Sequence, residues 1–237
     1  MAERLEEIVE EKSKLLSDSD PSKRLRALHE LTEIASYQEA AKRGRIVNLL
    51  AGLAGDKEPF ARWNLAMSLG IIGHPVAIPI LDNMADDEHA NVRFRVALSL
   101  GIIGDLTAIP VLEKMAGDEY KIGEHFVVRA FVALALGRIR HLSGVPVLAK
   151  LVEDPDPVVR WHAAVALGDI GHKSGVPHLA KLIEDNVPFV RAHTAIALAQ
   201  IGDISGLTYL ERLAKDKAPR VAKISSEALQ LLKNKSG

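Results

Sequence analysis

The chain has 237 residues, of which 48% are hydrophobic and only 4% aromatic, with 30 basic and 31 acidic side chains and no cysteine. The near-neutral balance excludes a global attraction to nucleic acid or anionic lipid, and the lack of cysteine excludes disulfides, thiolate catalysis and cysteine-ligated metals. No apolar stretch approaches membrane-spanning length, so we expect no membrane insertion. The lack of cysteine is typical of a reducing compartment, so we expect a cytoplasmic protein. The charge balance gives no reason to expect a nucleic-acid partner.

The chain begins with an amphipathic segment. Residues 2–17 place apolar side chains, among them Leu5 and Ile8, on one side of a helix, which predicts a capping helix. A second helix follows Asp18 and has Arg24 at the spacing of later arginines. A longer connection is expected around residues 37–44, before a helix at 45–54. We therefore predict that residues 1–55 form a divergent N-terminal cap repeat.

A repeated pattern, headed by arginines, organises residues 56–215. Each arginine precedes an alanine four positions on and a leucine seven positions on: Arg62, Arg93, Arg129, Arg160 and Arg191. The offset between successive copies is 31 residues, except for 36 between Arg93 and Arg129. The difference is a five-residue insertion at 120–124, expected to be a loop at the rim of the array. A fixed period of this length indicates a solenoid of helical hairpins.

Each unit is predicted to have a short outer helix, a turn and a longer inner helix, such as 144–152 and 157–170. Aspartates six residues before the arginines are expected to cap the inner helices and to form an ion-pair ladder: Asp18, Asp56, Asp87, Asp154 and Asp185. Prolines are expected near the starts of the outer helices: Pro79, Pro110, Pro146 and Pro177.

Two sets of glycines have distinct predicted roles. One set ends the inner helices in a left-handed conformation: Gly73, Gly104, Gly171 and Gly202. The other set lies inside the helices and permits close approach of the next unit: Gly70, Gly101, Gly137 and Gly168. In the turns after the inner helices, His74, His141 and His172 are expected to be structural, as cations that offset the helix dipole.

The C-terminal segment, 216–237, is predicted to be a cap helix that closes in a polar stretch. The whole chain, 1–237, is then a single all-α domain, an α-solenoid of about six to seven helical hairpins in a right-handed superhelix.

The combination of Asp, Val-Arg, Ala-x-x-Leu-Gly-x-Ile-Gly and Ile/Val-Pro-x-Leu resembles HEAT repeats, and more narrowly the short-period type named after phycobilisome (phycocyanobilin) lyases. The resemblance covers residues 56–215 well and both ends loosely. It implies the fold, whereas its members range from bilin lyase subunits to a di-iron hydroxylase and many scaffolds. The hydroxylase uses His-Glu pairs, and this chain has Ala after His162 and Thr after His193.

The side of the inner helices opposite the core is unusually apolar. Positions two before and one, two, five and nine after each arginine should face the concave surface, where family members usually carry charge. Six of the ten aromatic residues fall there. The candidate groove residues are Phe60, Trp63, Met67, Phe94, Arg95, Leu98, Phe131, Leu134, Arg138, Trp161, His162, Val165, Phe189, His193 and Ile196.

An apolar surface of this size predicts a partner or ligand. Our first hypothesis is a non-enzymatic scaffold that binds a protein partner in the groove. The alternative is a tetrapyrrole-binding, bilin lyase-like protein that acts on phycobiliproteins. A third reading makes the residues one past the arginine core wedges between inner helices. No catalytic motif is present, we expect no cofactor beyond a bilin or other tetrapyrrole, and His162 and His193 lack the carboxylates that support a metal site.

Overall fold

The structure is a computed structural model that describes residues 2–122 and 125–236, and it divides into two compact units, Met1–Val111 (unit 1) and Leu112–Gly237 (unit 2). Unit 1 contains α1 (Ala2–Leu15), α2 (Pro21–Ser36), α3 (Ala40–Leu50), the 3-10 helix η1 (Ala51–Gly55), α4 (Pro59–Ile72), η2 (Pro75–Ala77), α5 (Ile78–Asn83), α6 (Ala90–Ile103) and η3 (Leu106–Ala108). Helix α7 (Ile109–Met115) contains the boundary between the units.

Unit 2 contains the strands β1 (Lys121–Ile122) and β2 (His125–Phe126), then α8 (Val127–Ile139), η4 (Leu142–Gly144), α9 (Val145–Leu151), α10 (Pro157–Ile170), η5 (Lys173–Gly175), α11 (Val176–Ala180), α12 (Pro188–Ile201), η6 (Ile204–Gly206), α13 (Leu207–Leu213) and α14 (Pro219–Ser236). The predicted inner helix 157–170 coincides with α10. The outer helix expected at 144–152 is a 3-10 turn followed by α9.

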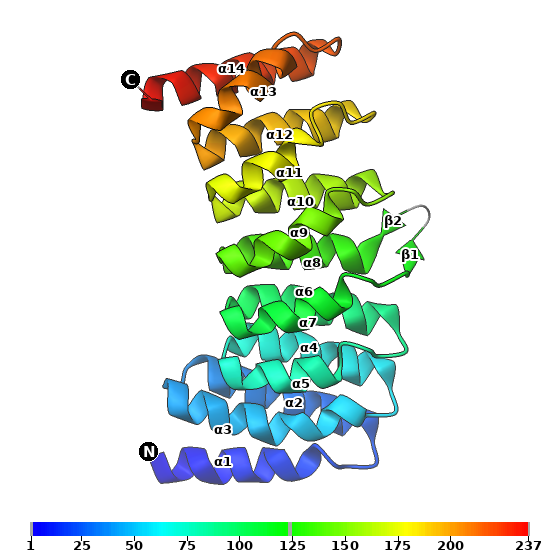
Figure 1. The fold of residues 1–237 in the computed structure, drawn as a ribbon. Helices are drawn as coiled ribbons and strands as arrows, with labels where there is room; N and C mark the ends of the chain where they lie inside the picture. Colours follow the sequence, from blue (N-terminus) through cyan, green and yellow to red (C-terminus); the bar gives the residue numbers. More distant parts are fainter. Residues whose placement is uncertain (1, 123–124, 237) are drawn as a thin grey trace. The chain divides into compact units, whose positions relative to one another are not determined.

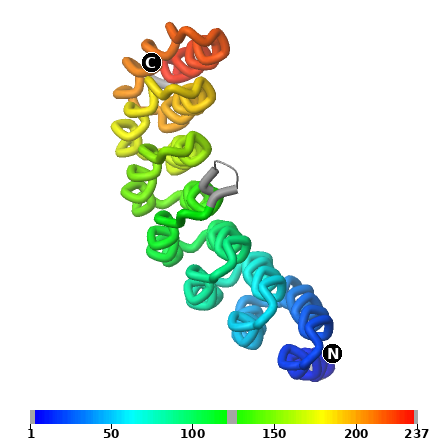
Figure 2. Tube along the Cα trace, turned by 90° about the vertical axis from the view of Figure 1, so that its right-hand side faces the viewer, coloured from blue at the N-terminus to red at the C-terminus, as the bar shows by residue number. Residues whose placement is uncertain are grey.

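The helices of each unit form two layers. In unit 1 the long helices α2, α4 and α6 pack side by side, and α3 and α5 form the second layer (Figures 1 and 2). In unit 2 the long helices are α8, α10, α12 and α14, backed by α9, α11 and α13. The predicted all-α solenoid is confirmed. The hand of a superhelix that spans both units stays a prediction.

Two predicted loops have structure instead. Helix α3 begins at Ala40, so the connection after α2 is only 37–39 and the prediction of a loop to residue 44 is wrong. Gly44 lies inside this helix. The ring of His74 packs against it, 3.1 Å from the position that a Cβ on Gly44 would take. In the 120–124 insertion, Lys121 pairs with Phe126 and Ile122 with His125 in an antiparallel ladder, while residues 123–124 lie outside the described part of the chain.

The arginine of one repeat pairs with the aspartate of the next. Arg160 donates through Nε and Nη2 to Asp185 at 2.6 and 3.0 Å, and its Nη1 donates to the carbonyl oxygen of Asp154 at 2.8 Å. The same side-on ion pair joins Arg24 to Asp56, Arg62 to Asp87, Arg129 to Asp154 and Arg191 to Asp216. The predicted ladder is confirmed, with the partner always in the following repeat.

These aspartates do not cap the long helices, so that prediction is wrong. Asp154 accepts the backbone N–H of Asp156 at 2.8 Å, and Asp156 is itself the N-cap residue, which accepts the N–H of Val158 at 2.8 Å. Oδ1 of Asp154 accepts both this N–H and Nη2 of Arg129, so the carboxylate stabilises the turn before α10 as well as the ion pair. At Asp154, burial raises the carboxyl pKa above its ordinary value despite the N–H of Asp156 and the charge of Arg129.

Glycines set the ends and the spacing of the long helices as predicted. The φ angles of Gly73, Gly104, Gly171 and Gly202 lie between +65° and +73°. In the repeat of α8, Arg140 occupies this position with φ +53°. Inside α10, a Cβ on Gly168 would stand 2.9 Å from Cα of Ala197 on α12, so only glycine allows the two helices to approach so closely.

The turn histidines are structural, since they cap the 3-10 turns that follow the long helices. Nδ1 of His74 accepts the N–H of Val76 at 3.3 Å, and His141 and His172 make the equivalent bonds at the start of η4 and η5. Asp105 fills the same position in the neighbouring repeat with a 2.9 Å bond. The histidines and the aspartate at this position therefore have the same role, which is to accept a backbone N–H of the turn.

Candidate binding faces on the long helices

The side of α10 that faces the core fixes the direction of its other residues. Ala163, Ala164 and Leu167 are fully buried, so the residues one, two and five positions after Arg160 lie on the opposite side of the helix. On α4, α6, α8 and α12 the alanine and the leucine four and seven positions after the arginine are buried in the same way. Asn64, Ala130 and Ala192, one or two positions after their arginines, are buried as well, so the prediction that these three face the concave surface is wrong. We call the exposed side of α4 and α6 face 1 and that of α10 and α12 face 2.

None of the fifteen predicted groove residues is fully buried. Four of them are exposed: Phe60, Arg138, Phe189 and Ile196. The others are half-buried: Trp63, Met67, Phe94, Arg95, Leu98, Phe131, Leu134, Trp161, His162, Val165 and His193. The prediction treated all these residues as equal, whereas the tryptophans contribute to packing as well as to the surface.

Aromatic rings and one arginine come together on face 1. The rings of Phe60 and Trp63, one turn apart on α4, are nearly parallel at 5° with centroids 6.1 Å apart. Phe60 is 63% exposed. The guanidinium carbon of Arg95, on α6, lies 4.3 Å from the centre of the Trp63 ring and 5.6 Å from that of Phe94. Such cation–π contacts contribute about 0.5–2 kcal/mol each.

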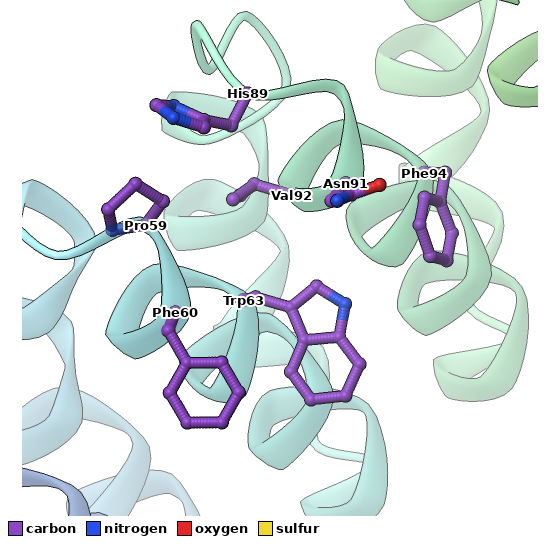
Figure 3. Close-up of a pocket in the computed structure, with 7 residues that line it drawn as sticks. All are labelled: Pro59, Phe60, Trp63, His89, Asn91, Val92 and Phe94. Atoms are coloured by element: carbon purple, nitrogen blue, oxygen red, sulfur yellow. The ribbon is translucent and has the colours of Figure 1, made fainter. Parts of the chain in front are cut away.

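A cavity of about 400 Å³ opens beside these rings, between the first turns of α4 and α6. Its lining is mostly apolar: Pro59, Phe60, Trp63, His89, Asn91, Val92 and Phe94. In Figure 3 the rings of Phe60 and Trp63 lie below Pro59 and Val92, and the ring of Phe94 lies to their right, beyond Asn91. Cavities of this size and character accept one or two large side chains.

Face 2 carries a cluster of two aromatic residues and two histidines. The Trp161 ring lies 4.1 Å from that of His162, 4.5 Å from that of Phe189 and 5.4 Å from that of His193, measured between centroids. His193 and Phe189 also meet edge to face at 4.5 Å. The cluster bridges α10 and α12, and it leaves Nε1 of Trp161 buried without a hydrogen-bond partner.

The electrostatics of this cluster favour a neutral His162. Burial lowers the pKa of His162, the charge of His193 lowers it further, and Asp156 acts in the opposite direction. His193 instead contacts the carbonyl oxygen of Phe189 through Nδ1 at 2.9 Å. Among the residues that the structure describes, no group of three or more histidines, aspartates or glutamates could hold a metal ion.

A second cavity, of about 270 Å³, lies beside this cluster, between α12 and α14. Its place relative to these two helices corresponds to that of the first cavity relative to α4 and α6. It is lined by Pro188, Phe189, Ala192, His193, Arg220, Val221 and Ile224. The sequence prediction missed the cavity walls, among them Pro59, Val92 and Val221. The Pro-Phe dipeptide that begins both α4 and α12 is the signal that these two sites share.

The repeated pairing of long and short helices defines a two-layered α-solenoid of the kind that serves as a protein scaffold. In both units the long helices of successive repeats are joined by the arginine–aspartate ladder. Sequence comparison then identifies the family. A model described as HEAT repeats matches residues 10–89, 77–123, 121–187 and 167–230, so the chain belongs to the HEAT-repeat family.

Solved structures of other HEAT-like proteins share the fold. YibA of Escherichia coli aligns with a TM-score of 0.61 at 20% identity, over 96% of this chain and 82% of its own. The complex of CpcE and CpcF of phycocyanin lyase from Nostoc sp. PCC7120 gives 0.56 at 23%, over 94% of each chain. The HEAT-like repeats protein of Thermococcus onnurineus NA1 gives 0.56 at 14%, over 89% and 98%.

These likenesses carry the fold and no activity, because every identity is below 25%. No curated protein matches the chain. Within the described residues, no helix combines the length and the apolar character needed to cross a bilayer.

Proposed function

We propose that this HEAT-repeat protein is a non-enzymatic scaffold that holds a protein partner on face 1 and face 2. The observation that carries the proposal is the exposure of large apolar side chains on a helical surface that would otherwise be charged. Phe60 is 63% exposed, Phe189 43% and Ile196 38%. Beside the two phenylalanines lie the two apolar cavities. Helical-repeat surfaces of this kind suit an amphipathic helix or an extended segment of a partner.

A paired substitution, one on each face, tests the proposal. We would purify the tagged protein from its native source and identify the proteins retained with Phe60→Glu and Phe189→Glu combined. Tyr37→Glu is the matched control, since Tyr37 is an aromatic residue that is 82% exposed but lies at the C-terminal end of α2 and belongs to neither face. We expect a specific partner to be lost only with the face variant, at an unchanged helical content. Retention of the same proteins by all three chains would contradict the proposal.

A tetrapyrrole is the second candidate ligand. The aromatic rings of face 1 and the charge of Arg95 offer the contacts that a flat chromophore with propionate groups would use. A cavity of about 400 Å³ holds only part of such a four-ring molecule, which is why we rank it below a protein segment. Titration with bilins and porphyrins decides: an unchanged absorption spectrum and unquenched tryptophan emission would eliminate it.

A further inference from the structure

Arg95 is a cation without an anionic partner. Among the residues that the structure describes, no carboxylate pairs with its guanidinium, although five other arginines of the chain form side-on pairs with aspartates. Its Nε is buried and lacks a hydrogen-bond acceptor. A buried donor that stays unpaired is unfavourable.

The surroundings of Arg95 are apolar and aromatic. Burial lowers the pKa of Arg95 below its ordinary value, but a guanidinium stays protonated at any physiological pH. The guanidinium lies against the ring of Trp63, and Trp63 also lines the cavity. An anion that approached Arg95 would meet it in partly desolvated surroundings, where a charge-assisted hydrogen bond is stronger than in water.

Arg95 would bind the anionic part of a ligand, and the cavity lined by Trp63 would bind its apolar part. Pro59, Phe60, Val92 and Phe94 offer apolar surface. Two carboxylates that precede the lining residue His89 are already engaged, because Arg62 pairs with Asp87 and also with Glu88. A ligand with a positive charge would be repelled by Arg95, which already covers the Trp63 ring.

This inference rests on the proposed function and gives the partner a chemistry. The geometry points to face 1 as a receptor for an acidic aromatic segment of a protein, whose aromatic side chain enters the cavity while a neighbouring carboxylate pairs with Arg95. The arginine–aspartate ladder is the internal precedent for the pairing geometry. An aromatic group of about one side chain fits the volume of about 400 Å³.

Three small probes with one ring and different charge test this assignment: phenylacetate, phenylacetamide and phenethylamine. Binding to the whole chain would be followed through the indole N–H signal of Trp63 in two-dimensional ¹H–¹⁵N spectra, identified by its absence in Trp63→Phe. We expect phenylacetate to bind about fivefold to tenfold more tightly than the amide, the amine to bind most weakly, and the preference to shrink as salt is added.

Arg95→Met removes the charge but keeps a long side chain over Trp63, and it should make the acid and the amide equivalent. The matched control is Arg26→Met, because Arg26 occupies the same repeat position on α2 but is exposed, whereas Arg95 is half-buried against the ring of Trp63. This variant should keep the preference. Should Arg95→Met fail to fold, the order of the three probes on the native chain and its salt dependence decide alone.

Equal binding of the acid and the amide by the native chain would overturn the role of Arg95 and leave the scaffold proposal standing. A Trp63 signal that no probe moves, or one that the amine moves most, would overturn the site itself. The scaffold proposal fails by a different result, the retention of partners by the face variant.

Discussion

Replacing Asp216 by asparagine tests how the repeats are held together. Arg191 donates through Nε and Nη2 to this carboxylate at 2.6 and 2.7 Å, and the two side chains are only 5% and 8% exposed. Asparagine can still accept the N–H of Ala218, now at 2.8 Å, so the turn before α14 is kept. The variant therefore isolates the loss of a negative charge opposite a buried guanidinium.

Removing one partner of a buried ion pair costs about 3–5 kcal/mol, because the other charge stays buried without compensation. Arg191 keeps its bond from Nη1 to the carbonyl oxygen of Asp185 at 2.6 Å. We therefore expect the lower end, about 3 kcal/mol in the free energy of unfolding. The matched control is Glu184→Gln, which breaks an ion pair with Arg212 whose side chains are 77% and 58% exposed; it should cost about 0.5 kcal/mol or less.

Urea denaturation followed by circular dichroism measures both variants. Because each repeat packs mainly on its neighbours, hydrogen exchange should also show α13 and α14 opening in Asp216→Asn while α8 and α10 stay protected. If Asp216→Asn costs no more than Glu184→Gln, the ladder does not stabilise the array in the way described.

The same pair predicts a pH dependence. The hydrogen bond from Arg191 lowers the pKa of Asp216 below its ordinary value of 3.8, against the opposing effect of burial. A lowered folded-state pKa gives stability that is present above 3.8 and is lost as the pH falls below that value. The stability gap between the native chain and Asp216→Asn should therefore close in that range, and a constant gap would contradict the assignment.

Three further predictions concern single positions. Gly168→Ala should lower the free energy of unfolding by about 1–3 kcal/mol in thermal denaturation, because its Cβ would collide with α12. Gly52→Ala, whose Cβ would face open space, should change the free energy of unfolding by about 0.5 kcal/mol or less. Equal effects would refute the close-approach argument. Arg140→Gly should raise the melting temperature, with a gain of about 0.5–1 kcal/mol, because φ there is +53°; a lower melting temperature would show that the charge of this arginine matters more than its backbone. In Trp63→Phe, which keeps Trp161 as its one tryptophan, the emission should fall only below pH 6.5, because a protonated His162 would quench it and burial lowers the pKa of His162. A midpoint of the emission change at or above pH 6.5 would contradict that shift.

The sequence by itself determined the elements and the repeat. Helix α10 is specified locally, by the apolar periodicity, by proline in the first turn and by glycine after the last turn, so its bounds could be predicted to the residue. The same register placed the fifteen candidate residues on the side of the long helices away from the core. The period of 31 residues then implied that like side chains recur along one face.

Only the tertiary structure decided what those side chains do, because contacts between repeats depend on how closely the helices stack. Sequence spacing could not decide whether an aspartate pairs with the arginine of its own repeat or of the preceding one. It could not separate Phe60, which stays exposed, from Trp63, which packs beneath Arg95, since both lie on the same side of α4. The cavity between α4 and α6 arises from two repeats together, so no single repeat contains it.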